Sequence, residues 1–96
     1  MSAKEEILKI LSNHKDSLYK KYPIRTLAIF GSIARDQSND QSDVDLMVEF
    51  DSNIGIRFID LADELEALLE RHVDVVSKNA IQPKYFHHIK NDLIYV

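Results

Sequence analysis

The sequence predicts a single small α/β domain in which a mixed β-sheet carries helices packed mainly on one face. Segments with helical and strand periodicity follow one another in the order α-β-α-β-α-β. One strand, residues 43–50, alternates cleanly between apolar and polar side chains. The 96 residues are 45% hydrophobic and 29% charged, which is enough for one core but not for a second lobe. We therefore expect residues 1–96 to form one domain.

The N-terminal segment has the pattern of a helix followed by a buried strand. Ser2 and Glu5 match a capping box, and apolar residues then recur at helical spacing, which predicts a helix over about residues 3–20. Pro23 ends that helix. Residues 24–30 are nearly all apolar, which is typical of a buried central strand.

The middle of the chain is predicted as a short helical turn at 33–36, a polar loop at 36–42 and the alternating strand at 43–50. The core face of that strand carries Val44, Leu46, Val48 and Phe50. The opposite face carries Asp43, Asp45, Met47 and Glu49. This strand therefore has one face for packing and one face for chemistry.

The remaining segments complete the predicted sheet and its helices. Residues 51–53 are expected to form a turn and a helix cap. The apolar periodicity that follows predicts a helix to about residue 71, packed on the sheet. A short strand is expected at 73–77, a helix that begins on a proline at 83–91, and a closing strand at 93–96.

Composition excludes several classes of protein. The net charge of −4 argues against sequence-independent binding to a nucleic-acid backbone, which needs clustered Lys and Arg. The chain has no cysteine, which excludes disulfides, thiolate catalysis and cysteine-ligated zinc. No run approaches the length of a membrane span, and the charged N-terminus lacks a signal-peptide core. We expect a cytoplasmic protein with no membrane partner and no direct nucleic-acid partner.

A glycine and a serine directly after the first predicted strand are suited to holding a phosphate. Gly31 lets the backbone approach an anion because no Cβ intervenes, and Ser32 adds a hydroxyl donor. Amides at the start of the following turn can point at the same anion. Arg35 could reach a phosphate oxygen, but it fits a surface ion pair with Asp36, Asp40 or another acid about equally well.

Three aspartates supply the candidate metal ligands. Asp43 and Asp45 are two residues apart on a strand, so they project from one face, and Asp74 lies inside an apolar segment on another strand. Carboxylate oxygens suit Mg²⁺, and two such ions can stabilise the attacking and leaving oxygens of a phosphate transfer. Without a cation, three close carboxylates would raise one another's pKa. Asp74 would bind the second ion or accept the proton of the attacking hydroxyl. Together these residues predict a nucleotidyl-transfer site.

Other polar residues are interpreted as structural. Glu49 lies too far along its strand to share a metal ion with the two aspartates and is expected to be solvated. His14 and His72 are interpreted as surface or helix-end residues. The adjacent pair His87–His88 has no third ligand nearby in the sequence. The four tyrosines fit packing at the edge of the core, although one of them could stack on a base.

The phosphate and metal motifs together resemble a known signature. Gly31–Ser32, ten further residues and Asp43–Val44–Asp45 resemble the G-S-x10-D-x-D signature of the DNA polymerase beta-like nucleotidyltransferases. The fuller strings at 30–35 and 42–46 resemble the minimal nucleotidyltransferase branch, and Asp74 matches its third carboxylate strand. The resemblance covers nearly the whole chain and implies a polymerase beta-like nucleotidyltransferase fold.

The resemblance also implies a function. Members of the minimal branch are often encoded beside a HEPN-domain protein, and they resemble antitoxins that transfer AMP from ATP to a tyrosine of a HEPN ribonuclease toxin, using Mg²⁺. The expected partner is therefore a HEPN toxin, bound in a hetero-oligomer. The roles implied for this chain are triphosphate binding by Gly31, Ser32 and Arg35, Mg²⁺ binding by Asp43, Asp45 and Asp74, and activation of the tyrosine hydroxyl by Asp74.

Two features bear on the alternatives. Many relatives have glycine after the arginine, whereas this chain has Asp36 and no glycine in the loop to Ser42, which bears on the path of that loop and on the phosphate contact of Arg35. We expect no extra domain to hold an acceptor, which argues against a small-molecule acceptor such as an aminoglycoside. A non-catalytic antitoxin that works by binding is the other alternative, but occupancy alone does not require three acids.

Overall fold

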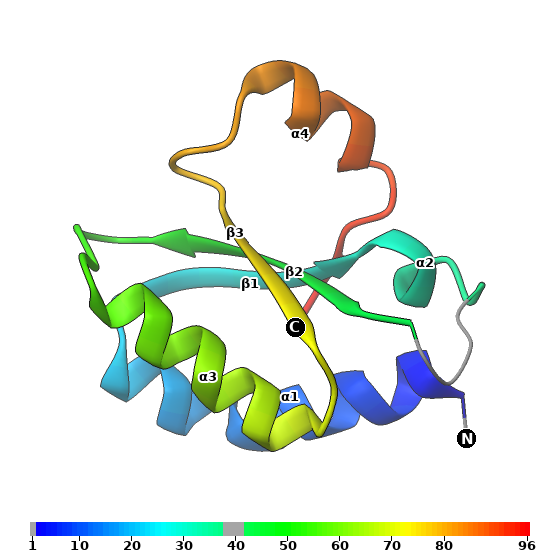
Figure 1. The fold of residues 1–96 in the computed structure, drawn as a ribbon, viewed down its shortest axis with the longest axis horizontal. Helices are drawn as coiled ribbons and strands as arrows, with labels where there is room; N and C mark the ends of the chain where they lie inside the picture. Colours follow the sequence, from blue (N-terminus) through cyan, green and yellow to red (C-terminus); the bar gives the residue numbers. More distant parts are fainter. Residues whose placement is uncertain (1, 38–41) are drawn as a thin grey trace.

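The computed structural model describes residues 2–37 and 42–96 and contains one mixed four-stranded sheet with the strand order β3-β2-β1-β4. Strand β2 pairs antiparallel with β1 and parallel with β3, and β4 pairs antiparallel with β1. The predicted mixed sheet is confirmed (Figure 1). The elements are α1 (Ala3–Lys21), β1 (Ile24–Phe30), α2 (Gly31–Ala34), β2 (Val44–Phe50), α3 (Arg57–Leu69), β3 (Val73–Ser77), α4 (Pro83–Ile89) and β4 (Ile94–Tyr95).

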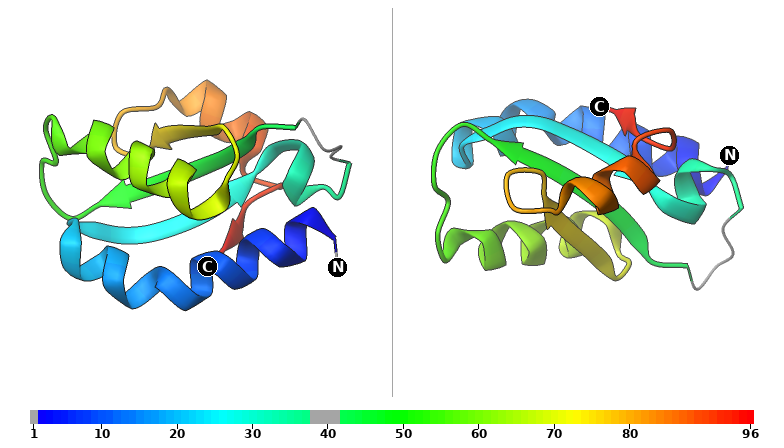
Figure 2. Two further views of the ribbon diagram at one scale, coloured as in Figure 1. Left: turned by 60° about the horizontal axis from the view of Figure 1, so that its bottom comes forward. Right: turned by 90° about the horizontal axis from the view of Figure 1, so that it is seen from above.

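The helices divide unequally between the two faces of the sheet. Figure 1 shows α1 and α3 side by side on one face and α4 alone on the other, and the view from above in Figure 2 places α4 across the middle of the sheet. The two long helices each present an apolar stripe to the sheet because their buried residues recur at helical spacing. These residues are Ile7, Leu11 and Leu18 of α1 and Leu61, Leu65 and Leu69 of α3. Their packing forms the main core.

A smaller cluster lies between the sheet and α4. Phe30, Met47 and Ile89 are its buried members. Met47 belongs to the face of β2 that was expected to carry only chemistry, yet its side chain is 0% exposed. The reason is tertiary, because α4 covers the middle of that face. The Asp45 end of the same face is only half-buried.

Of the two predicted helix caps, one is confirmed and the other is wrong. The predicted cap at the start of α1 is confirmed, since the Ser2 side chain accepts a hydrogen bond from the Glu5 N–H. The cap expected within 51–53 is wrong, because α3 begins at Arg57 after an N-cap residue, Ile56, that makes no side-chain capping bond. Asn53 instead accepts a hydrogen bond from the Gly55 N–H inside the preceding turn.

The segment between β1 and β2 differs slightly from expectation. Helix α2 begins at Gly31 rather than at residue 33. Of the predicted polar loop at 36–42, residues 38–41 lie outside the described part of the chain. None of the helices in residues 2–37 and 42–96 combines the length and the hydropathy that crossing a bilayer requires.

Candidate functional site

Strand register brings the predicted phosphate and metal residues to one end of the sheet. Phe30, the last residue of β1, pairs with Asp45 of β2, so Gly31 directly follows the position beside Asp45. On the other side of β2, Asp45 pairs in parallel register with Asp74 of β3. Paired residues on neighbouring strands share one face of a sheet. Asp45 and Asp74 therefore project from the same face of the sheet.

Gly31 makes close contact with the Asp45 carboxylate. Its φ is +78°, a left-handed backbone conformation that residues other than glycine adopt only with strain. A Cβ placed on Gly31 would lie 3.1 Å from Cγ of Asp45 and closer still to Oδ2. Both the turn and the carboxylate therefore require glycine at this position. Ser32 follows in the first turn of α2 and is half-buried.

Asp45 occupies an unfavourable electrostatic environment. Its pKa is raised, first because burial disfavours the charged form and then because the Asp74 and Asp43 carboxylates repel it. The Arg35 guanidinium acts in the opposite direction, but its effect is smaller. A divalent cation among these carboxylates would remove the repulsion. The donor set thus fits a hard cation such as Mg²⁺.

His72, which was interpreted from the sequence as a surface or helix-end residue, lies close to Asp43 and Asp74. Asp43, His72 and Asp74 each offer one ligand atom, and these three atoms lie within 4.8 Å of one another. All three side chains are exposed, including that of Asp74, although Asp74 lies inside an apolar segment of the sequence. Asp45 is not one of the three, since its carboxylate lies against Gly31.

The register of β2 and β3 explains why His72 belongs to the site. The backbone N–H of Val44 donates to the carbonyl of His72 at 3.0 Å, so His72 lies beside the start of β2. His72 precedes Asp74 by two residues, just as Asp43 precedes Asp45. Once the parallel pairing of Asp45 with Asp74 is known, this equal offset places His72 next to Asp43. The equal offset is visible in the sequence, but it places His72 in the site only when the register of β2 and β3 is known.

Arg35 makes an ion pair in addition to its influence on Asp45. Its Nη1 donates to Oδ2 of Asp92 at 2.7 Å, and its Nε donates to Oε1 of Gln37 at 3.2 Å. The expectation of an ion pair with a surface acid is therefore met, and the acid is Asp92 in the turn between α4 and β4. Glu49 is also paired rather than fully solvated, since it accepts a hydrogen bond from Thr26 at 3.2 Å.

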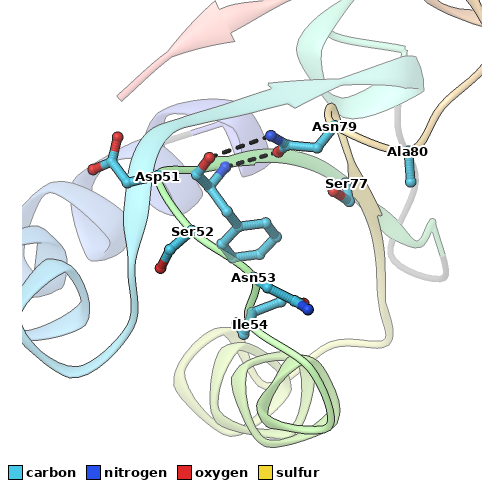
Figure 3. Close-up of a pocket in the computed structure, with 8 residues that line it drawn as sticks. Asp51, Ser52, Asn53, Ile54, Ser77, Asn79 and Ala80 are labelled. Carbon is cyan, nitrogen blue, oxygen red and sulfur yellow. Dashed lines mark hydrogen bonds between the residues drawn. The ribbon is translucent and has the colours of Figure 1, made fainter.

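A cavity of about 430 Å³ lies elsewhere, at the opposite end of β2. Figure 3 shows that its walls come from the turn after β2 and the turn after β3. The Asn79 side chain pairs with the backbone of Phe50, accepting from its N–H at 2.9 Å and donating to its carbonyl at 3.2 Å. None of the predicted site residues lines this cavity. The carboxylate cluster, which has the charge for chemistry, is therefore the candidate active site.

Comparison with known proteins points to the same class of chemistry. A family model described as "Polymerase beta, Nucleotidyltransferase" matches residues 5–96. A protein of Methanocaldococcus jannaschii, provisionally named a protein adenylyltransferase, is 43% identical over 98 residues, with 100% of both chains covered. Protein adenylyltransferase MntA of Thermococcus cleftensis is 36% identical over 93 residues, which cover 96% of this chain and 94% of that protein.

Solved structures share the fold. One provisionally named minimal nucleotidyltransferase superposes with a TM-score of 0.70 and 26% identity, over 98% of this chain and 95% of that one. A chain from the complex of tri-AMPylated Shewanella oneidensis HEPN toxin with MNT antitoxin gives a TM-score of 0.61 at 18% identity, over 97% of this chain and 67% of that one. At that identity the second likeness shows the fold alone. The predicted polymerase beta-like fold is confirmed.

Proposed function

The chain belongs to the polymerase beta nucleotidyltransferase family, and from this premise we propose that it transfers AMP from ATP to a tyrosine hydroxyl of a HEPN toxin. The observation that carries the proposal is the agreement between relatives and site. Proteins similar over nearly the whole chain are named protein adenylyltransferases, and Gly31, Asp45 and Asp74 lie together at one end of the sheet. The partner class is supported by the structurally similar complex that contains an AMPylated HEPN toxin.

The proposed roles follow from position. Gly31 and Ser32 would hold the triphosphate, since the glycine turn brings backbone without a Cβ close to the Asp45 carboxylate. Asp43 and Asp45 would hold Mg²⁺, which when bound neutralises charge on the triphosphate as it reacts. Asp74 would also contribute to Mg²⁺ binding. Arg35 would add positive charge near the phosphates, because it already lowers the pKa of Asp45.

The reaction balances with these groups. The tyrosine oxygen forms a bond to the α-phosphorus of ATP, and the bond from that phosphorus to the bridging oxygen of the β-phosphate breaks. Pyrophosphate leaves with the electron pair of that bond. The phenolic proton passes to a carboxylate oxygen of Asp74, which is exposed on the sheet face that would meet the acceptor.

Intact mass spectrometry tests the proposal directly. The chain is incubated with Mg-ATP and a HEPN protein encoded by the same organism, and the mass of the HEPN protein is followed with time. We expect increments of whole AMP units with the wild-type chain and none with the double variant Asp43→Asn, Asp45→Asn. Asp63→Asn is the matched control, because Asp63 is an exposed acid on α3 that is not among the grouped ligand residues.

Each other outcome selects a different function. A stable complex without any mass change would favour an antitoxin that works by binding alone. Toxin neutralisation that survives in the double variant would also contradict the proposal that neutralisation depends on AMP transfer. Adenylylation of a small hydroxyl compound by the isolated chain, with no change in the HEPN protein, would assign a small-molecule acceptor instead.

A further inference from the structure

We propose that His72 is a nitrogen ligand of the divalent cation bound by Asp43 and Asp74, so that the site is a mixed imidazole–carboxylate centre. The inference rests on the proposed metal-dependent function and adds a ligand that the three-aspartate motif does not contain. It starts from the grouping of the three side chains, whose ligand atoms lie within 4.8 Å of one another.

The distances within the group suit a shared ion. Ligands at about 2.1 Å from an octahedral ion lie about 3 Å apart when adjacent and about 4.2 Å apart when opposite. Nε2 of His72 lies 3.3 Å from Oδ1 of Asp74, close to the spacing of adjacent ligands. The three side chains are exposed, so small rotations that cost little packing would bring the other two pairs, which both include Asp43, within range of one ion.

The orientation of the His72 ring is held by a second carboxylate. Oε2 of Glu66, on α3, lies 2.8 Å from Nδ1 of His72 and also accepts a hydrogen bond from the backbone N–H of Val73 at 2.9 Å. Because Glu66 is an acceptor, Nδ1 carries a proton and Nε2 is the ring atom that faces the aspartates. Histidines that bind metals are typically held this way, with the second ring nitrogen donating to a carboxylate.

Backbone geometry holds this arrangement in place. Glu66 Oε2 bonds to the first residue of β3, and the carbonyl of His72 accepts from the first residue of β2. His72 is therefore tied on one side to α3 and on the other to the strand that begins next to Asp43.

The chemical consequence is a broader choice of metal. Imidazole favours later transition ions, whereas carboxylates and water suit Mg²⁺ and Mn²⁺. We therefore expect the site to bind Mn²⁺ through both oxygen and nitrogen. Loss of His72 should weaken Mn²⁺ binding by at least about tenfold, by analogy with the effect of removing groups that support metal ligands.

Pulsed electron paramagnetic resonance with Mn²⁺ alone tests this inference without nucleotide or partner. The metal-bound fraction is first measured from the loss of the free Mn²⁺ signal. We expect modulation from a directly coordinated ¹⁴N nucleus in the wild type, its disappearance in His72→Gln, and its retention in His87→Gln, which alters an exposed histidine of α4. Wild-type chain labelled with ¹⁵N-histidine should change the modulation without any substitution, so the test does not depend on a variant folding.

Bound Mn²⁺ without ¹⁴N coupling would overturn the inference, and so would a failure of the wild type to bind Mn²⁺. A failure of the inference about His72 can be distinguished from a failure of the proposed function. Coupling to ¹⁴N without AMP transfer would leave the mixed centre standing and remove the enzymatic proposal. AMP transfer by a chain whose bound Mn²⁺ shows no nitrogen coupling would support the enzymatic proposal and remove the mixed centre.

Discussion

Asp45 is a residue at which function and stability oppose each other. Burial and the carboxylates of Asp74 and Asp43 raise its pKa, and the charge of Arg35 compensates only in part. The fold therefore places the Asp45 carboxylate in surroundings that disfavour its charged form. A carboxylate that binds a cation commonly has a raised pKa in the metal-free protein, because only the bound cation relieves the repulsion between the neighbouring carboxylates.

Asp45→Asn should therefore stabilise the metal-free protein at neutral pH while lowering AMP transfer more than about 100-fold, since a catalytic cation contributes several kcal/mol. The sign follows from linkage. A raised folded-state pKa favours the fold below the ordinary aspartate value of about 3.9, and that contribution is lost as pH rises through the raised pKa. Thermal unfolding in EDTA should show the variant above the wild type at pH 7 but not at pH 3.

The matched control for this measurement is Asp63→Asn, which removes an exposed charge outside the cluster. It should produce no comparable gain at pH 7. A wild type that is more stable than Asp45→Asn at pH 7 without metal would contradict the electrostatic argument.

Gly31 and Gly55 form a matched pair for testing close approach. Both have positive φ, +78° and +60°, but a Cβ at Gly31 meets Asp45 whereas a Cβ at Gly55 meets nothing within 4 Å. Gly55→Ala should cost about 1 kcal/mol from backbone strain alone. Gly31→Ala should cost about 1–3 kcal/mol more and reduce AMP transfer. Urea denaturation measures both, and an equal cost at the two glycines would show that the collision with Asp45 is absent.

At the scale of elements, the end of α3 positions one side of the site. The helix closes on Glu70, whose φ of 52° and ψ of 38° are left-handed and whose N–H donates to the Glu66 carbonyl. This reversal turns the chain directly into β3, so that His72 and Asp74 arrive beside β2. The turn is made without glycine, the residue that adopts this conformation at least cost.

Glu70→Gly should stabilise the protein by about 1 kcal/mol, because glycine removes the left-handed strain at an exposed position. Lys9→Gly is the control, since Lys9 is exposed within α1 and glycine there should destabilise by about 1 kcal/mol. The free energy of unfolding from denaturant titration would show opposite signs. A loss of stability at both positions would mean that the Glu70 side chain has a stabilising role of its own.

For the whole molecule, the two faces of the sheet hold cores of different size. Leu46 and Met47 are neighbours on β2 and both are 0% exposed, but Leu46 belongs to the main core and Met47 to the small cluster under α4. Stability need not be uniform in such an arrangement, since a small cluster can open while the main core stays closed. The helix concerned, α4, flanks the face that carries the carboxylates.

Met47→Ala should therefore loosen α4 selectively, and Leu46→Ala should destabilise the entire domain by about 2–5 kcal/mol. Amide hydrogen exchange distinguishes the two effects. Met47→Ala is expected to accelerate exchange mainly in α4, whereas Leu46→Ala accelerates it in α1, α3 and the sheet together. Uniform acceleration in both variants would show that the two clusters unfold as one unit.

The parts of this molecule that sequence predicted are those governed by local pattern. Alternation predicted β2, the capping box predicted the start of α1, and the glycine–serine and aspartate motifs predicted residues that the fold brings together. The parts that it missed depend on distant partners. His72 joins the site only through the β2–β3 register, Met47 is buried only because α4 crosses it, and Arg35 pairs with Asp92 from the far end of the chain.

The pairing of Asp45 with Asp74 has a consequence for how this protein can diverge. Their separation is set by the distance between neighbouring hydrogen-bonded strands, about 4.8 Å, and not by the shapes of the side chains packed around them. Core residues can therefore be exchanged over generations without disturbing the spacing of the carboxylates, as long as the backbone ladder persists. Relatives that differ from this chain at more than half of the aligned positions are compatible with such freedom. The geometry needed for chemistry is inherited from the main chain, which mutation alters least.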